Sequence, residues 1–280
     1  MKSFKFTKMV ASGNDFVIVD SLQFKAYLPI RQAGKLKLEN LAKSLCNRRF
    51  GIGADGLLLV GRSRKAGIEM RIFNADGSEA QMCGNGARCV ALWESARRKT
   101  PNAKLNIETK AGVIHSEVRR ENVRIRLTDP KDLKLNIPVK VNNRTLKVNF
   151  INTGVPHAVI FVNGLENIDV DKIGRQVRFH KKFAPKGANV NFVEILSDNF
   201  IRVRTYERGV EGETLACGTG SAASALITAY NLQLMIYSMV NVKTRGGEIL
   251  KVYFDKCNGA FKNIWLEGKA GVVYKGEYNV

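Results

Sequence analysis

One short phrase occurs twice in the chain, and this duplication constrains the fold more than any other feature. The first copy begins at Cys83 and reads Cys-Gly-Asn-Gly; the second begins at Cys217, 134 residues later, and reads Cys-Gly-Thr-Gly. Each copy leads into an apolar, alanine-rich stretch that predicts a helix, over residues 84–99 and 218–234. The match extends upstream, where Arg71 and Arg204 open similar strand-like segments. A duplicated cysteine at the start of a duplicated helix predicts two pseudo-symmetric halves.

The length of the chain agrees with two domains. A chain of 280 residues is long for one hydrophobic core and sufficient for two. The midpoint of the repeat and the Thr128-Asp129-Pro130 break predict domains over residues 1–128 and 129–268. From its pattern alone, the last strand, over residues 271–278, is assignable to either half.

Strand-like alternation dominates the rest of the sequence and predicts an α+β fold. Short helices are expected at residues 36–47 and 170–180. The two helices that follow the cysteines are apolar on nearly every side, which is typical of buried helices. We therefore expect each half to be a curled mixed or antiparallel sheet wrapped around a central helix. The alternating segments cover residues 4–9, 104–109, 113–118, 123–127, 199–205 and 248–254.

Composition indicates a cytoplasmic protein. No stretch approaches the roughly 20 apolar residues of a membrane helix, and the N-terminus lacks the apolar segment of a signal peptide. Five cysteines are an odd number, which favours a reducing compartment. The net charge of +20 would suit nucleic acid or a membrane surface, but the basic residues are spread along the chain without a recognition motif. We therefore expect neither partner and take the charge as a solvated surface.

The duplicated phrase has a specific chemical consequence at a helix N-terminus. Backbone N–H groups of the first helical turn have no intrahelical partner, and the helix end carries about half a positive charge. Glycine lets a ligand approach this backbone, so the site suits a carboxylate. The same field favours the thiolate form of a cysteine there. Cys83 and Cys217 are thus expected to act as thiols or thiolates beside a bound anion, whereas Cys46 and Cys89 are expected in the core.

Competing motifs fit the sequence poorly. No Cys-x-x-Cys or His-x-x-x-His pair occurs, so no metal site is expected. The run from Gly51 to Gly56 matches Gly-x-Gly-x-x-Gly, but an apolar strand follows it instead of a helix, which argues against dinucleotide binding. No lysine signature for pyridoxal phosphate is evident either.

A larger set of motifs, in this order and spacing, resembles the diaminopimelate epimerase family over residues 2–268. The resemblance implies two domains with a central helix each, an active site in the cleft between them, and no cofactor. It also implies that the C-terminal strand, residues 269–280, returns to the first domain, and that the protein forms a homodimer. The motifs are Gly13-Asn14-Asp15-Phe16, Asn74-Ala75-Asp76-Gly77-Ser78, Met82-Cys83-Gly84-Asn85-Gly86-Ala87-Arg88, Pro156-His157, Ala188-Asn189-Val190, Tyr206-Glu207-Arg208-Gly209 and Ala216-Cys217-Gly218-Thr219-Gly220.

The resemblance also implies roles for individual residues in epimerising LL-2,6-diaminopimelate to the meso form, for lysine and peptidoglycan precursors. Cys83 and Cys217 would be the acid–base catalysts. Backbone N–H groups would hold the reacting carboxylate, and Arg208 would fork to the distal one. The backbone groups are those of Gly84, Asn85, Gly218 and Thr219. The distal end of the substrate would be held by Arg208 together with Asn14, Asn74 and Asn189. Near the reacting centre would lie His157 and Glu207.

Two departures from the family pattern leave the substrate open. Val155 stands where the family often has asparagine, and Asn152 is a candidate to compensate; Gly56 lacks a polar side chain that some members carry. The nearest alternative is a related cofactor-independent racemase of proline, hydroxyproline or histidine, which would give Arg208 no second carboxylate. Proline-type members often have histidine where this chain has Asn85. The remaining alternatives are a non-catalytic relative, which the two cysteines argue against, and a binding module for an anionic partner.

Overall fold

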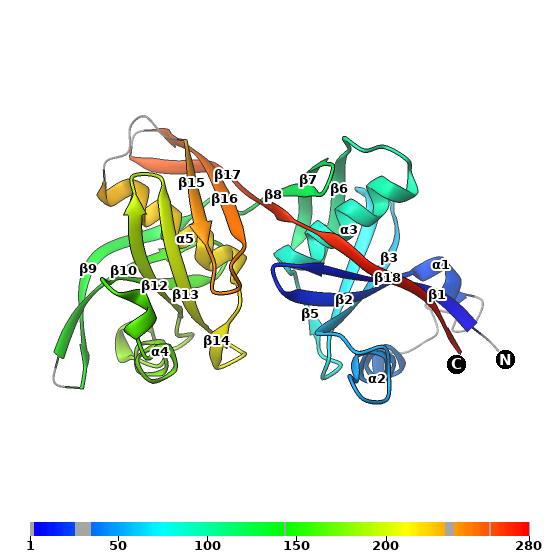
Figure 1. The fold of residues 1–280 in the computed structure, drawn as a ribbon, viewed down its shortest axis with the longest axis horizontal. Helices are drawn as coiled ribbons and strands as arrows, with labels where there is room; N and C mark the ends of the chain where they lie inside the picture. The colour runs from blue at the N-terminus through cyan, green and yellow to red at the C-terminus, as the bar shows by residue number, and fades with distance from the viewer. Residues whose placement is uncertain (1–2, 26–34, 143, 233–237, 258, 280) are drawn as a thin grey trace. The chain divides into compact units, whose positions relative to one another are not determined.

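The protein has a mixed α+β fold in which strands dominate, as the alternation predicts (Figure 1). The computed structural model describes residues 3–25, 35–142, 144–232, 238–257 and 259–279. The chain divides into two compact units: Met1–Ile125 with Gly268–Val280 form unit 1, and Arg126–Glu267 form unit 2. Among the described residues, no helix has the length and apolarity that a membrane crossing needs.

Unit 1 is a mixed sheet around one central helix. β1 pairs antiparallel with both β18 and β2, β2 runs parallel to β3, and β4 pairs antiparallel with β3 and β5 but parallel with β6. Antiparallel hairpins join β6 to β7 and β7 to β8. The strands are β1 (Ser3–Ala11), β2 (Asn14–Asp20), β3 (Gly56–Ser63), β4 (Gly67–Asn74), β5 (Glu79–Ala80), β6 (Lys104–Thr109), β7 (Gly112–Arg119), β8 (Asn122–Arg126) and β18 (Gly271–Asn279); the helices are α1 (Ser21–Lys25), α2 (Lys35–Cys46) and α3 (Gly84–Arg97).

Unit 2 repeats this pairing scheme in the same order. β10 pairs antiparallel with β9 and β11, β11 runs parallel to β12, and β13 pairs antiparallel with β12 and β14 but parallel with β15. Hairpins then join β15, β16 and β17. The elements are β9 (Lys131–Val141), β10 (Arg144–Asn152), β11 (Pro156–Phe161), η1 (Leu165–Asn167), α4 (Val170–Arg178), η2 (Lys181–Phe183), β12 (Asn189–Ser197), β13 (Phe200–Glu207), β14 (Gly212–Thr214), α5 (Gly218–Asn231), β15 (Met239–Lys243), β16 (Ile249–Cys257) and β17 (Ala260–Lys269).

The helices α3 and α5 lie among the strands of their own units, as their apolar composition predicts (Figure 1). In α5 the side chains from Gly220 to Ala229 are all buried, and most are alanine, serine or threonine. Small side chains let strands approach a helix closely, so each sheet can curl around its helix. α2 and α4 connect the parallel strands of their units, and each covers a separate apolar core.

Element boundaries differ from prediction mainly at helix ends. α3 ends at Arg97, and Lys99 then takes a left-handed φ of 55°, which a helix cannot continue through. α5 ends at Asn231, earlier than predicted, and residues 233 and 234 of the predicted helix lie outside the described residues. The prediction that Cys46 and Cys89 are core residues is confirmed, since both are buried.

Candidate active site

The first helix end presents a sulfur atom to its own first turn. Cys83 is the N-cap of α3, with the extended backbone (φ −142°, ψ 122°) that this position requires. Its sulfur accepts a hydrogen bond from the backbone N–H of Gly86 at 3.5 Å. The thiol also donates to the side-chain carbonyl of Asn14, with 3.8 Å between sulfur and oxygen. The sulfur therefore lies where the positive end of the helix favours negative charge.

Asn14 reaches Cys83 because three strand ends meet at one edge of the sheet. Asn14 starts β2, Gly56 starts β3 and Asn74 ends β4, and the pairing register places these ends side by side. The Asn14 amide also donates to Asp55 at 2.8 Å, and Asn74 donates to Ser78 at 2.9 Å. The edge thus carries both asparagines that the sequence assigns to the site, although Asn74 is engaged in its own turn.

A buried guanidinium distinguishes the first helix end from the second. Arg88 has no solvent exposure and donates to the Asn85 side chain at 2.7 Å and to Ser12 at 2.6 Å. The Asn85 side chain is therefore occupied within the helix end. Alanine stands at the matching position of the second copy, Ala222. A buried positive charge near only one of the two helix ends makes their electrostatics unequal.

The second helix end also has a cysteine as its N-cap, but the sulfur of this cysteine has a different neighbour. Cys217 is the N-cap of α5, again with an extended backbone (φ −116°, ψ 111°). Its sulfur lies 3.6 Å from the hydroxyl of Thr219. The backbone carbonyl of Thr219 in turn accepts from the Thr153 hydroxyl at 3.1 Å, which fixes the first turn.

His157 is fully buried, and the surrounding hydrogen bonds define its tautomer. The Asn191 amide donates to Nδ1 at 3.1 Å and to a backbone carbonyl, while the Thr205 hydroxyl donates to the Asn191 oxygen at 3.0 Å. Nδ1 is therefore an acceptor, and the proton of the neutral ring sits on Nε2. Burial, helped by the positive charge of Arg208, lowers the pKa of His157 to about 3. At neutral pH the ring is neutral, and its buried Nε2–H has no hydrogen-bond partner among the residues that the structure describes.

Glu207 lies at the same sheet edge as His157. β11 starts beside His157, β12 starts at Asn189, and β13 ends at Glu207, in the arrangement seen in unit 1. Burial raises the pKa of the Glu207 carboxyl, although a hydrogen bond of 3.0 Å from the Thr214 hydroxyl opposes this effect. A carboxyl held this way suits contact with a cationic group such as a substrate ammonium.

Arg208 follows Glu207 in the chain, and two hydrogen bonds hold it. Its backbone N–H donates to the side-chain oxygen of buried Asn189 at 2.7 Å. Its guanidinium donates to the backbone carbonyl of Lys186 at 3.3 Å. Asn189 therefore acts on the position of Arg208 in this structure, a connection that the sequence alone does not show.

The structure divides the sequence-predicted residues into two sets, one in each unit. Sequence reasoning missed several residues that support these sets, because their roles depend on pairing across strands. Asn191 has the clearest sequence signal in hindsight, since it lies two residues after Asn189 and therefore on the same face of a strand. The supporting residues that were missed are Asp55, Arg88, Asn191, Thr205 and Thr214.

Of the two departures from the family pattern, Gly56 has a local explanation and Val155 has none. A Cβ atom at Gly56 would lie 2.9 Å from the backbone carbonyl of Phe73, so this position has no room for a side chain. Asn152, the candidate to compensate for Val155, accepts from the Gly154 backbone at 3.1 Å with its side-chain oxygen. That oxygen is engaged in the loop, which leaves only the amide nitrogen of Asn152 to serve a ligand.

Sequence comparison places the whole chain in one family. The model of diaminopimelate epimerase matches residues 6–131 and 149–262. The chain belongs to the diaminopimelate epimerase family. It is 43% identical over 275 residues to the diaminopimelate epimerase of Hydrogenobaculum sp., with 96% of each chain covered. It is also 42% identical over 283 residues to that of Archaeoglobus fulgidus, covering 97% of this chain and 95% of the relative.

Two solved structures with the same fold share little sequence with this diaminopimelate epimerase family member. A Bacillus anthracis phenazine biosynthesis protein of the PhzF family superposes with a TM-score of 0.75 at 20% identity, with 100% of both chains covered. A hydroxyproline epimerase from Agrobacterium vitis gives 0.65 at 12% identity, covering 99% of this chain and 92% of that one. At these identities the likeness concerns the fold alone.

Proposed function

We propose that the protein epimerises LL-2,6-diaminopimelate to meso-2,6-diaminopimelate by a two-cysteine acid–base mechanism. Family membership over nearly the full chain supports the reaction. The observation that carries the mechanism is that Cys83 and Cys217 are both N-caps of central helices, α3 and α5, each with an extended backbone. The reaction serves the biosynthesis of lysine and peptidoglycan precursors.

Inversion of an amino-acid stereocentre requires removal of the α-proton and return of a proton to the opposite face. The chain's own groups must stabilise the negative charge that develops on the reacting carboxylate. Helix N-termini provide preorganised N–H donors for this purpose. The first turns of α3 and α5 provide them at Gly84, Asn85, Gly218 and Thr219.

The two cysteines need unequal protonation, one as thiolate base and the other as thiol acid. The surroundings of Cys83 and Cys217 differ, as unequal protonation of the two thiols requires. Arg88 is buried in α3 without a counterpart in α5, and Glu207 and neutral His157 occur only in unit 2. Because the two groups would titrate together, the unequal state is a property of the pair.

Recognition of the distal end distinguishes this substrate from smaller amino acids. We propose that Arg208 forks to the second carboxylate and that Asn14, Asn74 and Asn189 complete the distal site. A proline or hydroxyproline substrate has one carboxylate and would leave this guanidinium unused. Arg208 therefore favours diaminopimelate over the substrate in the name of the structural neighbour from Agrobacterium vitis.

The remaining parts of the proposal concern organisation. We propose that units 1 and 2 are the two epimerase domains, that the reaction needs no cofactor, and that the protein acts as a homodimer in the cytoplasm. Gel filtration with light scattering measures the oligomeric state, and a monomeric mass would contradict the dimer.

Hydrogen exchange at the α-carbon tests the reaction directly. The protein is incubated with LL-diaminopimelate in deuterium oxide, and α-deuterium and meso product are followed by mass spectrometry and chiral chromatography. The expected result is deuterium in the product of the wild type, with activity lowered by about 10²–10⁴-fold in Cys83→Ala and in Cys217→Ala. Cys46→Ala, which removes a buried core thiol, is the control and should retain exchange. Absence of α-deuterium with the wild-type protein would contradict the proposal, and a panel with proline, hydroxyproline and histidine identifies the alternative.

A further inference from the structure

Each catalytic cysteine is preceded, four residues earlier, by a glutamate that two basic side chains hold. Glu79 precedes Cys83 and Glu213 precedes Cys217. Between each glutamate and its cysteine lies only the end of a very short strand, β5 or β14, and a two-residue link. The basic side chains that bind each glutamate therefore also fix the short segment that leads to the cysteine.

In unit 1 the glutamate is almost completely buried and bridges two elements. The Arg71 Nε of β4 donates to Glu79 Oε1 at 2.8 Å, and Lys110, from the turn between β6 and β7, contacts Oε2. The Glu79 side chain is 3% exposed. Burial opposes ionisation of Glu79, but the hydrogen bonds from Arg71 and Lys110 outweigh it and lower the pKa of Glu79.

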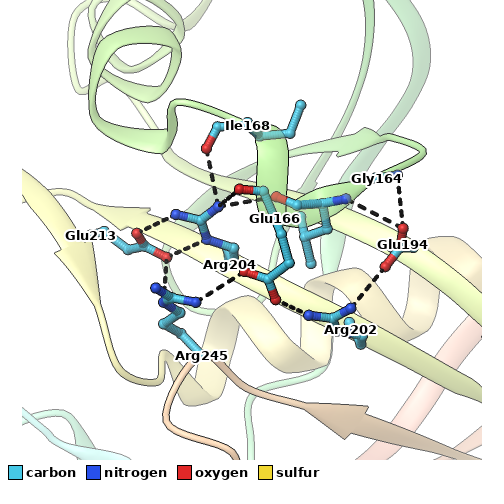
Figure 2. A network of polar contacts seen from close by, with 9 residues as sticks. Gly164, Glu166, Ile168, Glu194, Arg202, Arg204, Glu213 and Arg245 are labelled. Carbon is cyan, nitrogen blue, oxygen red and sulfur yellow. Dashed lines mark hydrogen bonds and ion pairs between the residues drawn. The ribbon is translucent and has the colours of Figure 1, made fainter.

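In unit 2 the same roles are filled by arginines, as Figure 2 shows. Arg204 of β13 binds both oxygens of Glu213 at 2.7 Å, and Arg245, from the turn between β15 and β16, lies 3.7 Å from Oε1. Arg204 also donates to the backbone carbonyls of Leu165 and Ile168 at 3.0 Å each. The glutamate is thereby joined to η1 as well as to its own sheet.

The two arrangements share one register. Glu79 lies opposite Phe73, and Arg71 is two residues before Phe73; Glu213 lies opposite Tyr206, and Arg204 is two residues before it. Each arginine is therefore the diagonal neighbour of its glutamate on the same face of the sheet. The second cation follows a threonine in the equivalent hairpin turn, after Thr109 and Thr244.

We propose that these two sets, here called the charge clamps, are positioning devices for the catalytic thiols. Clamp 1 consists of Arg71, Glu79 and Lys110, and clamp 2 of Arg204, Glu213 and Arg245. This inference rests on the proposed two-cysteine function. Strands as short as β5 and β14 have few ladder hydrogen bonds of their own, so side-chain anchors must fix the segment. A displacement of about 1 Å at a reacting group can cost about 10²-fold in rate.

The proposal is tested by the alkylation of each thiol in the absence of substrate. Glu79→Gln and Glu213→Gln are treated with iodoacetamide across a pH series, and modification of Cys83 and Cys217 is quantified separately by peptide mass spectrometry. Each variant should affect its own thiol alone. A loosened helix end stabilises the thiolate less, so the midpoint of that thiol's profile should rise by about 0.5 pH unit. Loss of the carboxylate charge by itself would move the midpoint in the opposite direction.

Catalysis provides a second readout. Each glutamine variant should lower kcat for LL-diaminopimelate about tenfold or more, with KM within about twofold, because the distal contacts of the substrate are untouched. Lys110→Met removes the partly exposed cation of clamp 1. Arg245→Met removes that of clamp 2 and also breaks the 3.1 Å ion pair of Arg245 with Glu166. These variants should show the same thiol-specific effect, but smaller. They also keep the proposal testable if a glutamine variant folds poorly.

A matched control comes from a cross-strand Arg–Glu pair that does not precede a cysteine. Glu117 opposes Arg124 on β7 and β8, and the Arg124 guanidinium donates to its carboxylate. Glu117→Gln should leave both alkylation profiles unchanged. Equal effects on both thiols, no effect on either, or the same effect from the control would overturn the proposal. The two tests are independent, because alkylation needs no substrate. If the wild type shows no α-deuterium exchange with diaminopimelate, the proposed function is refuted, and the alkylation profiles still decide whether the clamps position the thiols.

Discussion

His157 is a buried imidazole that the fold keeps neutral, and this has a consequence for stability. In the unfolded chain a histidine takes up a proton near pH 6.5, whereas burial and the charge of Arg208 lower the pKa of folded His157 to about 3. The unfolded state therefore binds more protons between these two values. The contribution is fully present above about pH 6.5 and is lost as the pH falls toward 3, by up to about 5 kcal/mol.

We expect this loss to be visible in urea unfolding. The midpoint for the wild type should decrease between pH 6.5 and 4 more steeply than that of His157→Gln, whose side chain does not titrate. His115→Gln, at an exposed position, is the control and should follow the wild type. Parallel curves for the wild type and His157→Gln would contradict the assignment of a neutral imidazole.

Arg208 is the residue proposed to bind the distal carboxylate of the substrate. Arg208→Lys keeps the positive charge but loses the planar fork that matches a carboxylate. We expect KM for diaminopimelate to rise about tenfold or more, with a smaller change in kcat, because the distal contact is made equally in the ground and transition states. Steady-state kinetics measure both constants, and Arg175→Lys, exposed on α4, is the control. An unchanged KM would remove Arg208 from the distal site.

At the scale of elements, the glycines of the two helix ends are not equivalent. A Cβ atom at Gly220 would lie 2.3 Å from the side-chain oxygen of Asn191, the residue that holds His157, and 3.3 Å from the Cys217 sulfur. At Gly86 the nearest contact would be a methyl carbon of Leu58 at 3.2 Å, which can shift. The second helix end is therefore packed more tightly against its sheet.

Alanine substitutions should reveal this difference. We expect Gly220→Ala to destabilise the protein by about 1–3 kcal/mol and to reduce activity, because the new methyl group displaces Asn191. Gly86→Ala should be nearly neutral in stability, since the gain in helix propensity of about 1 kcal/mol offsets the tight contact. Thermal unfolding and α-deuterium exchange measure the two effects. Equal behaviour of the two variants would show that the packing difference has no energetic weight.

At the scale of the whole molecule, the chain returns to its beginning. β18 pairs along β1 from Asn279 opposite Ser3 to Gly271 opposite Val10, and ring contacts join Phe4 to Tyr278 and Phe6 to Tyr274. Unit 1 therefore needs β18, Gly271–Asn279, to complete its sheet, whereas unit 2 is continuous in sequence.

Deletion of residues 271–280 should consequently affect the units unequally. We expect backbone amides of β1 to exchange hydrogen markedly faster in the truncated protein, while those of β12 keep their protection, because each unit has its own core. Exchange followed by mass spectrometry resolves the two regions. Val272→Ser, at an exposed position of β18, is the control and should exchange as the wild type does. Uniform loss of protection would indicate that the units unfold together.

Much of the molecule was determined by the sequence itself. The duplicated Cys-Gly-x-Gly phrase predicted two buried helices, and the alternation predicted the strands around them, because helix caps and side-chain periodicity are local properties. Only the tertiary structure decided which side chains support the cysteines. Asp55 reaches Asn14 across 41 residues and Asn191 reaches His157 across 34, and Glu79 and Glu213 gain their partners through strand register. Such contacts arise from pairing between distant segments, which local sequence patterns do not encode.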